Sequence, residues 1–240
     1  MFATAAQFAL GAIGDPAARR AHLEWQSLSR LPAASLDPDI AGGACWARAP
    51  DCAAAIVAAD PDFASVDYAE AFWLRRRGTH VPPPSARAGR RPLDAPFVPV
   101  KGYVVPRVLV SPDALVFRPA RAVHLVLTRF VKHDAEAEDV FRWYDQVRIP
   151  DLLECRGVAG AWSFATAALF EPSRDVSAPA LRILVVFLDG EPLDFLADLA
   201  DREPALRRAG RLRDTSGVEQ PVFAGPLRTV VPWRWDRVAG

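Results

Sequence analysis

The chain has 240 residues, of which 51% are hydrophobic and 24% are charged, and its 29 Lys and Arg balance 29 Asp and Glu. This composition is typical of a folded protein with a sizeable core and excludes a disordered chain. A formal net charge of zero provides no basic surplus for the phosphate backbone, so we expect no nucleic-acid partner.

The first half of the chain alternates strand-like and helix-like segments. An apolar stretch predicts a strand over 5–13, and Asp15 followed by Pro16 is a typical helix start. We expect this helix to end before Pro32, because a proline disfavours helical geometry in the residue that precedes it. Later elements are expected as a strand at 44–47, a helical turn within 52–59, a strand at 66–74 and an irregular Pro/Arg-rich connector at 75–96.

The second half repeats this alternation. A β-branched apolar run predicts a strand over 123–131, and Asp134 then caps a helix expected to end before Pro150. The remaining elements are expected as strands at 161–168 and 181–188 and an amphipathic helix at 192–210.

The two halves share the pattern W-x4-R-x-P. Trp25 and Arg30 match Trp143 and Arg148 at a constant separation of 118 positions, with no gap. Their ends also match, since the pattern F-x6-VVP begins at Phe97 in the first half and at Phe223 in the second. We therefore predict a tandem duplication with domains at 1–116, including the 75–96 connector, and 117–240.

The expected order β-α-β-β-α-β in each half predicts an α+β fold of two ferredoxin-like repeats. Each antiparallel sheet carries helices on one face and leaves its other face to be covered. Packing the two sheets against each other covers both faces, which predicts an α/β barrel within a single chain.

The segment FRWYDQVRIPDLLECRGVAGAW resembles the EthD-like branch of the dimeric α/β-barrel superfamily. The matching residues are Trp143, Tyr144, Asp145, Pro150, Asp151, Leu152, Leu153, Gly157 and Val158. Related barrel proteins also place a His in the first strand, where His124 stands. One departure matters: the family's loop His is replaced by Arg148, and by Arg30 in the first half. An arginine stays protonated and cannot serve as a general base.

The resemblance implies a cofactor-independent enzyme that acts on a small, partly apolar organic molecule. We expect acid/base chemistry of the cyclase, isomerase or lyase type, with His124 as base, Arg148 stabilising an oxyanion, and Tyr144 and Asp145 as further catalytic candidates. The candidate substrate-binding residues are Trp143, Trp25, Arg30 and His22.

Each candidate also has a purely structural interpretation. His124 and His22 can be packed core residues, and Tyr144, Trp143 and Trp25 can pack without meeting a ligand. Asp145 lies three residues before Arg148, a spacing that favours an ion pair at the helix end.

Two functional alternatives stay open at this point, because a fold does not determine a function. One is a non-catalytic small-molecule-binding or accessory protein, and the other is a cofactor-independent monooxygenase or a haem enzyme using His124, His22 or His80. Association of two chains into a homodimer is left open as well.

The expected location is the cytoplasm, with no metal, no cofactor and no membrane partner. The apolar N-terminal stretch lacks a preceding basic region, and no apolar run approaches the roughly 18 residues that a membrane span needs. Cys45, Cys52 and Cys155 form no C-x-x-C pair and are odd in number, which fits a reducing compartment.

Overall fold

The computed structural model describes residues 3–82, 90–104, 108–110, 120–132, 134–169 and 180–230. Its strands form one ten-stranded antiparallel sheet. They are β1 (Ala5–Ala12), β2 (Ile40–Ala47), β3 (Val57–Ala58), β4 (Tyr68–Leu74), β5 (Arg90–Val104), β6 (Val108–Val110), β7 (Ala122–Phe130), β8 (Val158–Ala165), β9 (Leu181–Leu188) and β10 (Glu219–Thr229).

The sheet closes into a barrel because its long strand β5 has two partners. The first part of β5 pairs with β1, and the second part pairs with β8. Each half has the strand order of a ferredoxin-like unit, β5-β1-β4-β2 in the first and β10-β7-β9-β8 in the second. The α+β class and the ferredoxin-like barrel are therefore confirmed.

Two seams join the halves, and they differ in length. The seam between β5 and β8 runs from Val98 opposite Ala165 to Val104 opposite Gly160. The seam on the other side joins β10 to two strands of the first half. It pairs Arg228 with Ala47 and Thr229 with Trp46 of β2, and Phe223 with Ala58 and Ala224 with Val57 of β3.

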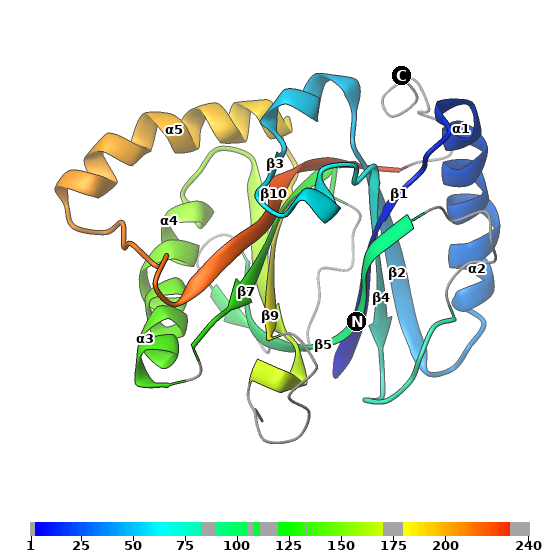
Figure 1. Cartoon of the computed structure of the whole chain (residues 1–240), viewed down its shortest axis with the longest axis horizontal. Coiled ribbons are helices and arrows are strands. Elements are labelled where there is room, and N and C mark those ends of the chain that lie inside the picture. Colours follow the sequence, from blue (N-terminus) through cyan, green and yellow to red (C-terminus); the bar gives the residue numbers. More distant parts are fainter. Residues whose placement is uncertain are drawn as a thin grey trace.

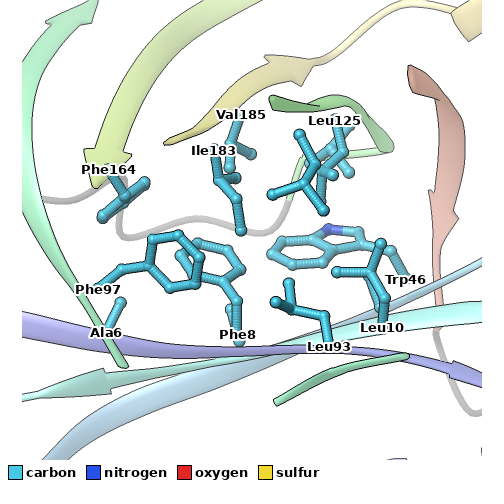
Figure 2. Packing of buried hydrophobic residues seen from close by; sticks show 14 of the residues in the cluster. Ala6, Phe8, Leu10, Trp46, Leu93, Phe97, Leu125, Phe164, Ile183 and Val185 are labelled. Atoms are coloured by element: carbon cyan, nitrogen blue, oxygen red, sulfur yellow. The ribbon is translucent and has the colours of Figure 1, made fainter. Parts of the chain in front are cut away.

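The barrel interior is a packed apolar core. Alternate residues of the strands point inward, as a period of two requires. Phe8 lies edge-on to Phe97 and Phe164, with ring centroids 5.5 Å and 5.0 Å apart (Figure 2). These side chains fill the interior, which leaves the outer surface beside the helices as the place for a functional site.

The helices cover the barrel from two opposite sides (Figure 1). The first-half helices α1 (Pro16–Trp25) and α2 (Leu31–Ala34) lie on one side, and α3 (Ala135–Trp143), α4 (Ile149–Leu153) and α5 (Pro192–Arg208) lie on the other. Asp15 and Asp134 accept hydrogen bonds from the first-turn amides of α1 and α3, as expected of N-caps. No helix in the described ranges is long and apolar enough to cross a membrane.

The expectation that both long helices end before a proline is wrong. A π-helical turn continues each of them, Gln26–Arg30 (η1) and Tyr144–Arg148 (η5), and an α-helical turn carrying Pro32 or Pro150 follows. The wide turn is closed by a hydrogen bond from Leu31 N to Gln26 O in one case, and from Ile149 N to Tyr144 O in the other. The proline then lies in the first turn of a new segment, where its missing N–H costs little.

The connector expected over 75–96 is also corrected. Strand β5 begins at Arg90, so the last residues of that range belong to the barrel wall. A strand tolerates Pro92 and Pro96 where no ladder bond is needed from them. Short 3-10 turns at Pro50–Ala55 (η2) and Pro61–Phe63 (η3) stand between β2 and β4. The matched residues 105–106 and 231–232 lie outside the described residues.

Candidate functional site

Two surface pockets lie at matching positions beside the two π-helical turns. The larger has a volume of about 520 Å³ and is bordered by Trp143, Tyr144 and Arg148. The smaller, of about 450 Å³, is bordered by Trp25 and Arg30, the residues 118 positions earlier. The W-x4-R pattern thus lies at a pocket in each half.

The larger pocket has an aromatic wall and an aliphatic wall. Trp143 and Tyr144 stand edge to face with ring centroids 4.7 Å apart. Helix α5 contributes the side chains of Leu196, Leu199 and Ala200 to the same pocket.

A loop over 212–215 completes this pocket, and two contacts fix the start of that loop. Arg211 forms a forked ion pair with the buried carboxylate of Asp151, with Nη2 2.5 Å and Nε 3.0 Å from Oδ1. The indole Nε1 of Trp143 donates to the carbonyl of Arg211 at 3.0 Å. The pocket wall is therefore preformed by residues of the IPDLL segment and of α3.

Arg148 and the exposed Arg213 are the cations of this pocket for which no ion pair is found among the described residues. The neighbouring Arg207 pairs with Glu203 at 2.7 Å, whereas the half-buried Arg148 has no ion pair with any residue that the structure describes. An unpaired guanidinium beside an aromatic wall is suited to hold a carboxylate, a phenolate or an enolate.

A buried ionic group lies directly behind Tyr144. Its hydroxyl donates to Glu219 at 2.8 Å, and the fully buried Arg182 donates to the other oxygen of that carboxylate at 3.0 Å. The Arg182 guanidinium also stacks on the Tyr144 ring, 3.2 Å from its centroid. Burial raises the pKa of Tyr144, and the charge of Glu219 adds to the rise while Arg182 opposes it.

Asp145 does not form the expected helix-end ion pair. Among the described residues its carboxylate has no bond to Arg148, and burial raises its pKa against the opposing charges of Lys101 and Arg182. Its carbonyl accepts a hydrogen bond from Tyr103 at 3.3 Å. Asp145 faces the junction of β5 with the helix rather than the pocket.

His124 faces the helices but does not border the larger pocket. Its ring lies 5.5 Å from that of Phe195, and its Nδ1 has no hydrogen-bond partner in the described ranges. Burial, and then the charge of Arg148, lower the pKa of His124 to about 4. The structure thus brings His124 within electrostatic reach of Arg148 without bringing both to one pocket wall.

The pairing of the strands shows which residue of the first half occupies the position equivalent to His124. In the second half, Val186 of β9 is paired with His124 on one side and with Ala161 on the other. In the first half, Phe72 of β4 is paired in the same way with Gln7 and with Gly43. Because Gly43 and Ala161 are themselves 118 positions apart, Gln7 stands in the first half at the position equivalent to His124.

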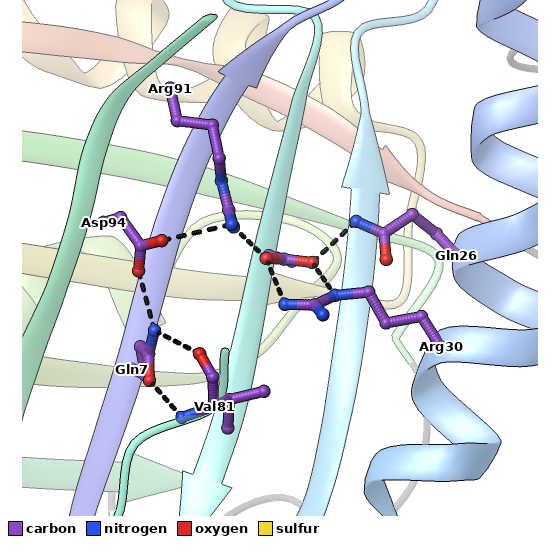
Figure 3. Close-up of polar contacts among 7 residues, drawn as sticks. Gln7, Gln26, Arg30, Val81, Arg91 and Asp94 are labelled. Carbon is purple, nitrogen blue, oxygen red and sulfur yellow. Dashed lines mark hydrogen bonds and ion pairs between the residues drawn. The ribbon is translucent and has the colours of Figure 1, made fainter. Parts of the chain in front are cut away.

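The first half holds a buried polar cluster that the sequence did not reveal. Glu70 accepts hydrogen bonds from Gln26 at 2.6 Å and from two nitrogens of Arg30, and it pairs with Arg91 (Figure 3). Arg91 continues the cluster to Asp94 at 3.1 Å. The signal that could have revealed it is an acidic residue in the apolar strand YAEAFWL, since a buried carboxylate needs partners.

His22 is buried between aromatic rings, 4.8 Å from the Tyr68 ring and 5.8 Å from the Trp25 ring. Neither of its nitrogens has a hydrogen-bond partner among the residues described. Burial lowers its pKa, and Glu70 opposes this while Arg91 and Arg30 add to it. His22 packs behind the smaller pocket rather than lining it.

No family model matches the sequence, and no curated protein matches it. Three solved structures share the fold over nearly the whole chain. A "putative monooxygenase" from Lactobacillus acidophilus is 11% identical, with a TM-score of 0.50 over 96% of this chain and 95% of that chain. Another from Fusobacterium nucleatum is 7% identical, with a TM-score of 0.54 over 96% and 94%. A dye-decolorizing peroxidase from Bacteroides thetaiotaomicron is 7% identical, with a TM-score of 0.52 over 100% and 95%.

These comparisons correct the expected reaction class. The similar structures are named as monooxygenases and a peroxidase, so the expectation of a cyclase, isomerase or lyase is wrong. At such low identity the similarity itself establishes the barrel fold.

The haem alternative needs a His beside a sufficiently large cavity. The exposed His80 borders the smaller pocket, and of the histidines described none lines the larger one. The residues of the larger pocket therefore do not fit a haem. In the described ranges no group of three or more His, Cys, Asp or Glu could hold a metal ion.

Proposed function

We propose that the chain binds a small organic anion with a planar apolar body in the larger pocket and oxidises it. The observation that carries the proposal is the position of Arg148, an unpaired cation of the described region, between an aromatic and an aliphatic wall. In this arrangement Arg148 holds the anionic group, and the ligand body lies between Trp143 and the leucines of α5.

Oxidation is supported by the names of the structures that share the fold and by the environment of Tyr144. We propose dioxygen as the oxidant. Tyr144 lines the pocket, and its hydroxyl donates to the buried carboxylate of Glu219 at 2.8 Å, so a proton leaving the phenol has an acceptor in Glu219. The pair can pass a proton to and from a molecule bound at the wall.

We further propose that the chain arose by tandem duplication and belongs with the EthD-like branch. Support comes from the two π-helical turns at matching positions, from the same strand order in each half and from the motif around Trp143. The chain and the similar structures cover almost all of each other, which supports a common architecture of this length.

The test has a binding arm and a reaction arm. Calorimetry should detect 3,4-dihydroxybenzoate binding that Arg148→Leu abolishes and Arg148→Lys weakens, because a forked donor is lost. An oxygen electrode should detect oxygen consumption with this probe that Tyr144→Phe lowers by roughly 10²-fold or more, the usual cost of removing a proton-transfer group. If the probe binds but no oxygen is consumed, with or without Tyr144→Phe, the result would favour the non-catalytic binding protein.

A further inference from the structure

The smaller pocket, on the first half of the chain, differs from the larger one in the state of its arginine. Arg30 donates through Nε to Glu70 at 3.1 Å and through Nη2 at 3.2 Å, and the Glu70 side chain is 2% exposed. Its charge is therefore neutralised from behind by a buried carboxylate. Arg148, in the equivalent position, has no such partner among described residues.

The walls of the smaller pocket are mostly apolar. Trp25 is 36% exposed and provides a flat aromatic face. The other apolar lining residues are Ala33, Ala34, Ile40, Val81 and Pro82. Ser29, His80 and Asp37 stand at the exposed rim of the pocket. Ser29 and His80 offer hydrogen-bonding groups to a ligand, and the carboxylate of Asp37 disfavours an anionic one.

One wall of this pocket is held rigidly by a buried amide. The Gln7 side chain donates to Val81 O at 3.0 Å and accepts from Val81 N at 2.8 Å, so both backbone groups of Val81 are satisfied (Figure 3). Gln7 also donates to Asp94 at 2.7 Å, which ties the wall to the Glu70 cluster. The pocket is therefore preorganised and loses little entropy on binding.

We propose that the smaller pocket is a second binding site, selective for an uncharged planar aromatic molecule. Trp25 stacks on the ligand, Val81 and Ile40 enclose its edges, and Glu70 removes the anion preference that Arg30 would otherwise give. This site goes beyond the proposed function, because it is formed by other residues and takes an uncharged ligand instead of an anion.

The test uses two probes of one shape, neutral indole and anionic indole-3-carboxylate, with one blocking substitution per pocket. Ala33 and Ala200 are exposed lining residues, so Ala33→Phe and Ala200→Phe each fill one pocket without disturbing the core. Affinities are measured by calorimetry on the full chain.

We expect Ala33→Phe to weaken indole binding about tenfold or more and to leave indole-3-carboxylate binding unchanged. Ala200→Phe should leave indole binding unchanged. Indole binding that is absent or unaffected by Ala33→Phe, or a carboxylate probe that binds the smaller pocket equally well, overturns the second site. Indole-3-carboxylate binding that ignores Ala200→Phe instead counts against the larger pocket and the proposed function, so the two failures are distinguishable.

Discussion

Tyr144 donates a 2.8 Å hydrogen bond to Glu219, and the same carboxylate compensates the fully buried charge of Arg182. The pocket wall thus depends on a charge pair that no solvent reaches. Removing one partner of such a pair leaves the other charge uncompensated in the interior.

We therefore predict that Glu219→Ala lowers the free energy of unfolding by about 3–5 kcal/mol, because Arg182 is left buried without a counter-charge. Urea unfolding measures this as a lower midpoint. The matched control is Asp201→Ala on the exposed face of α5, which should stay within about 0.5 kcal/mol of the parent. Equal effects of both substitutions would contradict the buried pair.

The pH dependence of stability should carry the signature of His124. The pKa of His124 is about 4 in the folded state and roughly 6.5 in the unfolded chain. Between these two pH values the unfolded state binds a proton at His124 and the folded state does not. Stability is then lost as the pH falls from about 6.5 towards 4, by about 2 kcal/mol between pH 7 and 5.

His124→Gln should remove most of this loss, and Gln7 shows that a glutamine is accommodated at the equivalent position of the first half. Unfolding curves at pH 7 and pH 5 measure the difference, with the exposed His80→Gln as control. His22 contributes in the same direction, since burial also lowers its pKa. An unchanged pH dependence of stability in His124→Gln would show that folding does not lower the pKa of His124.

Gln7→Leu keeps the side-chain volume and removes the hydrogen bonds to Val81 and Asp94. We expect a loss of about 1–3 kcal/mol, because the buried backbone groups of Val81 lose their partners. Hydrogen exchange should show faster exchange of the Val81 amide. Gln220→Leu, on an exposed position of β10, is the control and should leave that amide unchanged.

Asp134→Ala removes the side-chain oxygen that accepts from Glu136 N at 3.0 Å at the start of α3. The expected loss is about 1 kcal/mol, the usual contribution of an N-cap, seen as a lower urea midpoint with an unchanged slope. Asp15→Ala, which uncaps α1, should have a similar effect. A change in slope would mean that the substitution altered more than the cap.

Local sequence patterns predicted much of the fold. The run LRILVVFL predicted β9 at 181–188, and the apolar face of 192–210 predicted α5, because both signals lie within one segment. The W-x4-R pattern predicted that Arg30 and Arg148 occupy equivalent positions.

The polar contacts could not be predicted in the same way. Glu70 meets Arg30 across 40 positions and Arg91 across 21, and only the folded sheet brings the three together. The wall formed by 212–215 depends on Arg211 reaching Asp151, 60 positions away. The helix ends were predicted wrongly because a widened turn accommodates a proline, and propensity rules describe only regular α-helix.

The unequal seams of the barrel determine where the closed ring should open first. The ladder between β5 and β8 extends from Val98 to Val104. In the described residues β10 is joined to the first half by two short stretches, to β2 at Trp46 and Ala47 and to β3 at Val57 and Ala58. Arg228 reinforces the junction with β2 through ion pairs to Asp51 and Glu191. Thermal fluctuations that release these few bonds would unzip the ring on one side and leave the halves hinged along β5, a motion that amide exchange at β2 would reveal before global unfolding.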